Sequence, residues 1–146
     1  MWTVYRRYNT ITRKSYIGIT HTTIDKRWEL DRINAQKLQK LKLSIEGKKY
    51  PNDKVLRKIR RAEGTVAMDL LLMGEQCWEH TVLETHESFV MGLLAERRLI
   101  IVYDSQDPAK GYNRSAGGEL PRYCTITQLI NELTLLTDEE KRLIGI

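Results

Sequence analysis

The fold is decided by two runs near the N-terminus: Trp2-Thr3-Val4-Tyr5-Arg6-Arg7-Tyr8 and, after a polar linker, Lys14-Ser15-Tyr16-Ile17-Gly18-Ile19-Thr20. Both runs are rich in aromatic and β-branched residues, which favour strands, and the linker suits a turn. We therefore predict a β-hairpin in which Tyr5 lies opposite Tyr16. Because side chains alternate between the faces of a strand, the two tyrosines and Gly18 then share an open face, opposite a core face with Val4 and Ile17. On the open face both phenols could reach one small ligand group, for which Gly18 would leave room.

The rest of the chain predicts an α+β fold. Expected helices run from Thr22 or Thr23 towards Leu43, from Asn52 to Glu63, from Glu87 to Tyr103, from Thr127 to Leu135 and onward from Thr137, whose capping-box partner is Glu140. Trp78 to Glu84 reads as a strand, and Val66 to Met73 is ambiguous between strand and helix. Asp104 to Glu119 reads as a loop. We expect a small antiparallel three-stranded sheet flanked by helices over residues 1–119, and a short helical C-terminal extension over 120–146.

Positive charge is concentrated in the first part of the chain. Residues 1–61 hold 17 Lys and Arg against 5 Asp and Glu, whereas the remainder holds 7 against 14. One interpretation is a solvated helix face, but the length of the basic run and its position just after the hairpin favour a polyanionic partner, namely nucleic acid. The residues expected to contact nucleic acid are Arg7, Lys14, Lys37, Lys40, Lys48, Lys49, Lys54, Arg57, Lys58 and Arg61.

Other bulk properties restrict the class of protein. No apolar run is long enough to cross a bilayer, and no signal pattern opens the chain, so we expect no membrane association. Cys77 and Cys124 have no CxxC spacing, which argues against a disulfide scaffold or a zinc site and favours a reducing cytoplasm.

Glu96 is the second informative residue. On the helix predicted for Glu87 to Tyr103 it shares a face with Phe89, Leu93 and Ile100. A carboxylate on a largely apolar face is costly unless it is paired or binds a metal. Pairing with a nearby arginine or with a basic residue of the first half is one interpretation, and metal binding is the other.

In order and type these pieces resemble the GIY-YIG endonucleases. Val4-Tyr5-Arg6 stands where that family has its first signature, and Tyr16-Ile17-Gly18 is the second signature intact. The other matching positions are Arg27-Trp28, the run Asn52 to Gly64, Glu96-Arg97-Arg98-Leu99-Ile100, Gly111-Tyr112-Asn113 and Gly117-Gly118. The resemblance covers about residues 2–119.

The resemblance implies metal-dependent hydrolysis of DNA phosphodiester bonds by water, with Mg²⁺ as the metal and Mn²⁺ as a substitute. Glu96 would be the metal's protein ligand, which suits a hard cation that keeps much of its hydration. Tyr5 would activate water, although a phenol with a reference pKa of about 10 needs nearby cationic charge to do so at neutral pH. Tyr16 would bind the scissile phosphate or the water, and Arg27 would neutralise the transition state. Asn113 would hold the geometry of the metal site without contacting the metal itself.

The chain departs from the family's pattern at several positions. Arg6 falls on the predicted core face, which suggests that the first strand is an edge whose long side chain escapes to water. Asp31 stands where many members have a histidine, and it could pair with Arg27 or assist proton transfer. His21 could replace the missing base, although a surface role is the commoner one for such a residue.

Three classes of function remain open at the level of sequence. The first is a small DNA endonuclease of homing, restriction, repair or phage type in the cytoplasm of a bacterial or phage-infected cell. The second is a non-catalytic nucleic-acid-binding module that keeps the fold. The third is an assembly protein, whose acidic tail packs on the core or joins two subunits of a homodimer.

Overall fold

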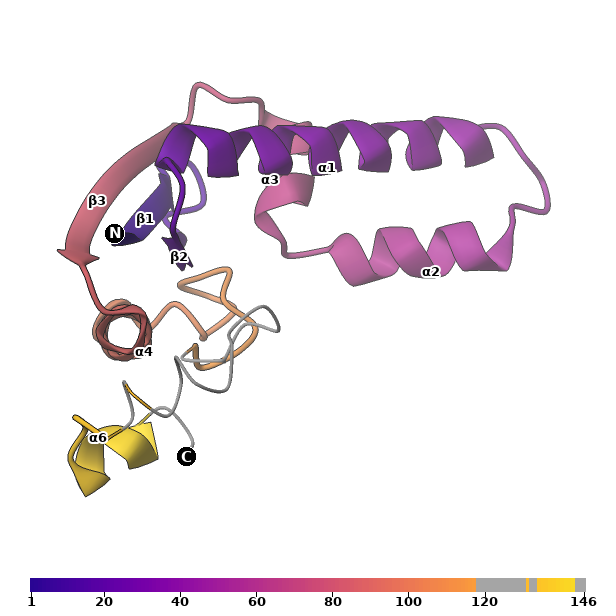
Figure 1. Ribbon diagram of the computed structural model, residues 1–146. Helices are drawn as coiled ribbons and strands as arrows, with labels where there is room; N and C mark the ends of the chain where they lie inside the picture. Colours follow the sequence, from indigo (N-terminus) through magenta and orange to yellow (C-terminus); the bar gives the residue numbers. More distant parts are fainter. Residues whose placement is uncertain (118–130, 132–133, 144–146) are drawn as a thin grey trace. The chain divides into compact units, whose positions relative to one another are not determined.

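A computed structural model describes residues 1–117, 131 and 134–143. Within these residues the fold is α+β, with a three-stranded antiparallel sheet in the order β2-β1-β3 and five helices (Figure 1). The predicted α+β class with a three-stranded antiparallel sheet is therefore confirmed. The strands are β1 (Trp2–Asn9), β2 (Ser15–Thr20) and β3 (Trp78–His86), and the helices are α1 (Ile24–Ile45), α2 (Asp53–Ala62), α3 (Val66–Met73), α4 (Phe89–Tyr103) and α6 (Asp138–Leu143).

Most element boundaries follow from local capping. The side chain of Asn52 accepts a hydrogen bond from the backbone N–H of Lys54 at 2.8 Å and starts α2, as predicted. The ambiguous segment 66–73 is a helix, because Thr65 caps it by accepting from the N–H of Met68 at 3.2 Å. Ser88 caps α4 in the same way.

The hairpin forms, but its register differs from the prediction by two residues. Tyr5 pairs with Gly18, and Arg7 pairs with Tyr16. The reason lies in the turn: the Asn9 side chain accepts from the N–H groups of two following residues, and Arg13 adopts a left-handed conformation at φ 60°. This geometry makes the connection longer than a tight two-residue turn. Because the shift is an even number of residues, the two faces keep their predicted members.

The interpretation of β1 as an edge strand was wrong. β1 is the central strand, and Arg6 on it does not escape to water. Its guanidinium lies between the rings of Tyr8 and Tyr103, 4.4 and 4.6 Å from their centroids, and donates to the Ser15 hydroxyl at 3.0 Å. Stacking between two aromatic rings therefore replaces hydration as the means of placing this cation on the core face.

The chain divides into two compact units, one of residues 1–24 with 79–146 and one of residues 25–78. In the first unit, hereafter the sheet unit, Val4 and Ile17 pack with Ala95, Leu99 and Ile100 of α4. In the second, hereafter the helical unit, α1, α2 and α3 fold together, and the rings of Trp28 and Trp78 meet at 5.7 Å.

The tail contributes to the sheet unit. Thr137 and Glu140 form the predicted capping box, with reciprocal hydrogen bonds of 3.2 Å at the start of α6. Leu136 packs against the buried cluster of Phe89, Val90 and Leu93. The helix predicted for residues 127–135 falls mostly on residues outside the described part of the chain. Among the described helices, none has the length and apolar character needed to cross a membrane.

Candidate functional site

The two tyrosines lie together on one face of the hairpin, but that face is not open. Their ring centroids are 6.2 Å apart with the planes tilted by 50°, and Tyr5 is only 2% exposed. Gly18 is needed here because a Cβ at this position would lie 2.5 Å from the Tyr5 hydroxyl oxygen and 2.8 Å from the Tyr16 ring. The space that was expected to admit a ligand is thus filled by the Tyr5 phenol, a packing detail that the pattern of residues does not reveal.

Arg7 lies beside this pair and is also buried, at 1% exposure. Its guanidinium carbon is 4.8 Å from the centroid of the Tyr5 ring, and its Nη1 lies 3.1 Å from Nδ1 of His80 on β3. A guanidinium in this position has little surface to offer a DNA phosphate. Its place against the Tyr5 ring fits instead the nearby cationic charge that a Tyr5 phenol would need to activate water. The contribution of His80 could not be found from sequence, because no motif marks it.

The outer edge of β2 is held by the loop that follows α4. The side-chain oxygen of Asn113 accepts from the N–H of Ile17 at 2.9 Å, and its Nδ2 donates to the Ile17 carbonyl at 2.8 Å. Backbone bonds from Ser15 to Lys110 and from Tyr112 to Ser15 extend the contact. Asn113 therefore clamps β2 at the residue between Tyr16 and Gly18.

The same loop continues to Glu96. Gly117 leaves its Cβ position empty, and that position is 2.8 Å from Oε1 of Glu96, which is half-buried on α4. Asn113 and Gly117 are four residues apart, a length of chain that reaches at most about 14 Å. One short loop thus carries the clamp on β2 at one end and lies against the Glu96 carboxylate at the other.

The geometry also separates Glu96 from the tyrosines. α4 packs on the face of the sheet that carries Val4 and Ile17, and the pleat puts Tyr5 and Tyr16 on the opposite face. A site that uses both must therefore be completed around the edge of β2. The neighbouring arginines have contacts of their own: Arg97 donates to the Gly117 carbonyl at 3.3 Å, and Arg98 pairs with Glu84.

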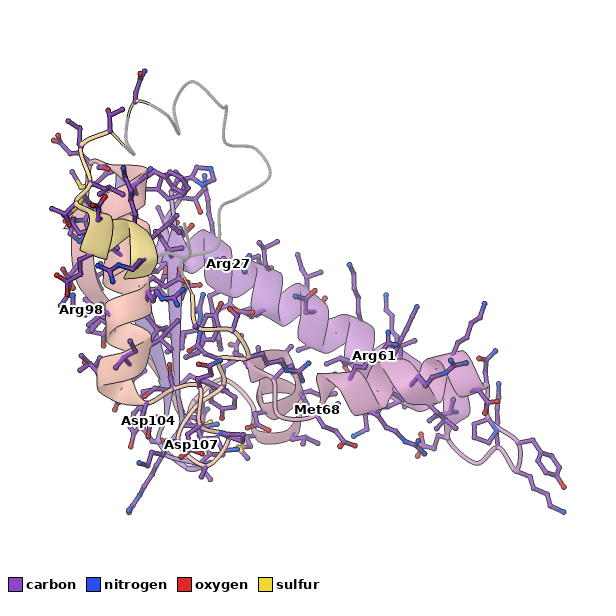
Figure 2. All side chains as sticks on the ribbon, turned by 90° about the horizontal axis from the view of Figure 1, so that it is seen from below. Arg27, Arg61, Met68, Arg98, Asp104 and Asp107 are labelled. Atoms are coloured by element: carbon purple, nitrogen blue, oxygen red, sulfur yellow. The ribbon has the colours of Figure 1, made fainter. Side chains whose placement is uncertain are left out.

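The remaining predicted site residues lie on α1 and just after β2. Arg27 and Asp31 are half-buried one turn apart on α1, in the helical unit. Figure 2 labels Arg27 on α1 and Arg61 on α2. His21 is exposed and packs on the ring of Trp2 at 5.2 Å, on the side of the sheet where Trp2 meets Phe89. That contact suits a surface packing role.

The basic residues of the second half of α1, of α2 and of the connection between them form an exposed cationic surface. Ten Lys and Arg between residues 36 and 61 are all exposed, and nine of them form no ion pair with the described residues. These nine are Lys37, Lys40, Lys42, Lys48, Lys49, Lys54, Arg57, Lys58 and Arg60. Lys14 lies instead on the hairpin, half-buried, with its ammonium 5.7 Å from the ring of Tyr112.

Ion pairs perturb two other cations at the surface. Arg32 donates hydrogen bonds to the carboxylates of Glu29 and Glu75, and these bonds raise the pKa of Arg32 above its ordinary value. A hydrogen bond to Asp104 raises the pKa of Lys110 in the same direction. Asp104 lies just beyond the C-terminal end of α4, where Figure 2 labels it near Asp107. Solvent screens such exposed pairs, so they contribute little to stability.

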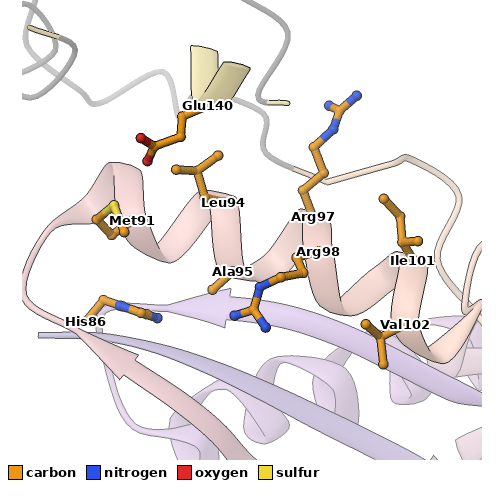
Figure 3. A pocket seen from close by; sticks show the side chains of 9 residues that line it. All are labelled: His86, Met91, Leu94, Ala95, Arg97, Arg98, Ile101, Val102 and Glu140. Carbon is orange, nitrogen blue, oxygen red and sulfur yellow. The ribbon is translucent and has the colours of Figure 1, made fainter. Parts of the chain in front are cut away.

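A separate groove of about 350 Å³ runs along the outer side of α4 (Figure 3). Met91, Leu94, Ile101 and Val102 supply its apolar lining, and Glu140 of α6 reaches it from the tail. The groove is distinct from the tyrosine face, and its proximity to α6 agrees with a tail that packs on the core.

The donor set at Glu96 limits the kind of metal it could bind. Among the described residues, no group of three or more His, Cys, Asp or Glu side chains could hold a metal ion. A single carboxylate fits Mg²⁺ only where waters and phosphate oxygens complete an octahedral shell, and it is too sparse for a structural zinc or calcium site.

Comparisons of the chain with models of protein families, with curated proteins and with solved structures gave no match.

Proposed function

We propose that this chain is a Mg²⁺-dependent DNA endonuclease of the GIY-YIG type, in which Mn²⁺ can replace Mg²⁺. The observation that carries the proposal is the loop from Asn113 to Gly117. Its first residue fixes the β2 backbone between Tyr16 and Gly18, and its last residue lies against the Glu96 carboxylate. Such a loop would bring the phosphate-binding edge and the metal ligand into one site.

Each residue has a role in this proposal. Glu96 would hold the metal, which when bound would stabilise negative charge on the phosphate and the leaving oxygen. Tyr5 would support the attacking water, helped by the Arg7 guanidinium against its ring. Tyr16, less buried than Tyr5, would hydrogen-bond the phosphate. Arg27 belongs to the helical unit, so its assignment to the transition state rests on the resemblance alone.

The cationic surface of α1 and α2 supports DNA as the substrate. The helical unit holds 13 Lys and Arg against 8 Asp and Glu, whereas the sheet unit is balanced at 11 against 11. The whole net charge of +5 thus belongs to the helical unit. Cations without carboxylate partners release bound counterions from DNA when they contact phosphates, which favours binding. An enzyme of this kind would act in the cytoplasm of a bacterial or phage-infected cell.

The test is cleavage of supercoiled plasmid with and without Mg²⁺. Glu96→Gln removes the charged ligand but keeps the side chain's size, and Glu87→Gln, at an exposed position just before α4, is the matched control. We expect wild type and Glu87→Gln to cut the plasmid only with Mg²⁺ or Mn²⁺, and Glu96→Gln to lose at least ~100-fold in rate, as for the loss of one strong electrostatic group. Metal-dependent cleavage that persists in Glu96→Gln would remove Glu96 from its role.

A second candidate, a nucleic-acid-binding module without catalysis, is favoured by one observation. Tyr5 is almost fully buried and its ring fills the space above Gly18, as a packing residue would. Tight, salt-sensitive binding of a plasmid that stays intact under every divalent metal would establish this alternative in place of the nuclease.

A further inference from the structure

The connection between α1 and α2 carries an aromatic residue that packs on almost nothing. Tyr50 is 85% exposed, and its ring has the Lys49 ammonium 5.7 Å from its centroid. Its hydroxyl makes no hydrogen bond with the described residues. Tyr50, between Lys49 and Pro51, gives the fold no core contact, so its ring is open to a ligand.

The helix that follows adds an aligned row of cations. Lys54, Arg57, Lys58 and Arg61 are spaced by three, one and three residues, a spacing that puts them on one side of α2. From Lys54 to Arg61, a span of seven residue steps, the helix rises about 10 Å, and each DNA strand carries one phosphate charge per about 3.4 Å of helix axis. The row therefore spans the axial length of about three nucleotide steps.

The opposite side of α2 is already occupied. Val55, Leu56 and Ile59 are half-buried, and Ile59 shares a groove with Leu43 of α1 and Leu72 of α3. The apolar stripe of α2 thus faces its own unit, and the cationic row faces solvent. Figure 1 shows α1 and α2 as neighbouring helices joined by the connection that contains Tyr50.

This arrangement favours DNA over a lipid surface as the ligand. Residues 47–52 read Gly-Lys-Lys-Tyr-Pro-Asn and offer one aromatic ring without the cluster of apolar side chains that inserts into a bilayer. A ring flanked by cations is typical of proteins that stack on bases while holding the backbone. In an intact duplex the base faces are covered by their neighbours, so a tyrosine can stack only where a base is unpaired.

We propose that the α1–α2 connection recognises DNA with unpaired bases, Tyr50 stacking on an exposed base and the cationic row of α2 binding the flanking phosphates. This inference rests on the proposed function for its choice of DNA as ligand. It adds to that function a preference for gapped or single-stranded sites, which the catalytic residues do not provide.

The test is a binding titration of the full chain in EDTA, so that cleavage does not enter the measurement. The probes are a fluorescent duplex with a gap of a few nucleotides and the same duplex without the gap. Tyr50→Ala should weaken binding to the gapped duplex by ~5- to 150-fold, the range expected from 1–3 kcal/mol of stacking per base. Tyr50→Phe, which keeps the ring, should bind as wild type does, and binding to the intact duplex should change less than about twofold.

A second measurement separates phosphate contacts from stacking. Affinity for DNA falls with salt, and Arg57→Gln should make the slope of log affinity against log salt less steep by about 0.7–0.9. The ratio of the affinities for the two duplexes should stay the same. The inference would be overturned if Tyr50→Ala lost the same affinity for both duplexes, or lost affinity for neither. It would also be overturned if the chain bound no DNA at all, or if it bound anionic phosphatidylserine vesicles equally tightly through Tyr50. If the Tyr50→Ala protein binds gapped DNA as tightly as wild type and still cleaves plasmid, this inference is wrong and the proposed nuclease function is unaffected.

Discussion

Replacing Asn113 with alanine should destabilise the protein and loosen the edge of β2. The substitution removes the hydrogen bonds to the N–H and the carbonyl of Ile17, a residue with no exposed surface. A buried polar group that loses its partner costs about 1–3 kcal/mol, and two such groups at a strand edge, partly reached by water, give about 2–4 kcal/mol. For a chain of this size the corresponding fall in melting temperature is roughly 6–12 °C.

The assay is urea unfolding followed by circular dichroism, together with hydrogen exchange at the Ile17 amide. Asn113→Asp is the informative partner variant, because a carboxylate can still accept from the Ile17 N–H but cannot donate to its carbonyl. Asn113→Asp should lose about half as much unfolding free energy as Asn113→Ala does, or more. Asn34→Ala, on the exposed surface of α1, is the control and should change stability by less than about 0.5 kcal/mol.

The reasoning about the clamp would be refuted by a loss below about 0.5 kcal/mol in Asn113→Ala, or by an unchanged exchange rate at the Ile17 amide. Either result would mean that the 110–113 segment does not hold β2 in solution.

Three further substitutions test the packing around the site. Gly18→Ala would drive a Cβ to within 2.5 Å of the Tyr5 hydroxyl, so we expect a loss of about 1–3 kcal/mol in urea unfolding and an altered near-ultraviolet tyrosine spectrum; an unchanged spectrum would contradict the close approach. Gly111→Ala would place a Cβ 2.1 Å from the backbone oxygen of Ser105, and backbone cannot move aside cheaply. We therefore expect the variant to lose about 3 kcal/mol or more of unfolding free energy, or to give no soluble protein. A near-normal melting temperature would refute this packing. Thr65→Ala removes the cap of α3 and should cost about 1 kcal/mol, which helical content at intermediate urea will report; no difference from wild type would show that the cap is dispensable.

The sequence predicted where helices and strands lie better than it predicted how they pair and pack. Capping residues such as Asn52 and Thr137 act over two or three residues, so a short stretch of sequence contains both partners of each bond. The register of the hairpin depended on the Asn9 side chain and on a left-handed Arg13, two choices that the strand pattern does not specify. The segment 66–73 was ambiguous because its apolar run fits either structure, and the Thr65 cap decided it.

For the candidate site, the sequence predicted the residue types and the face that they share, but not how deeply they are buried. Which face Tyr5 and Tyr16 share follows from a period of two, whereas the burial of Tyr5 follows from the absent Cβ of Gly18 and from Arg7 against its ring. The position of Arg6 between two rings likewise required Tyr103, which lies 97 residues later in the chain. Contacts of this range are set by the tertiary fold, which local patterns do not encode.

The most direct test of the central claim is whether one metal ion reports on both ends of the Asn113–Gly117 loop. We expect Mn²⁺, added to ¹⁵N-labelled protein in the presence of an uncleavable DNA analogue, to broaden the amide signals of Gly117 and of residues 16–18 together. Glu96→Gln should abolish both effects, and Glu87→Gln should abolish neither. Broadening confined to other parts of the chain, or broadening at these amides that survives in Glu96→Gln, would contradict a metal site that joins Glu96 to the edge of β2.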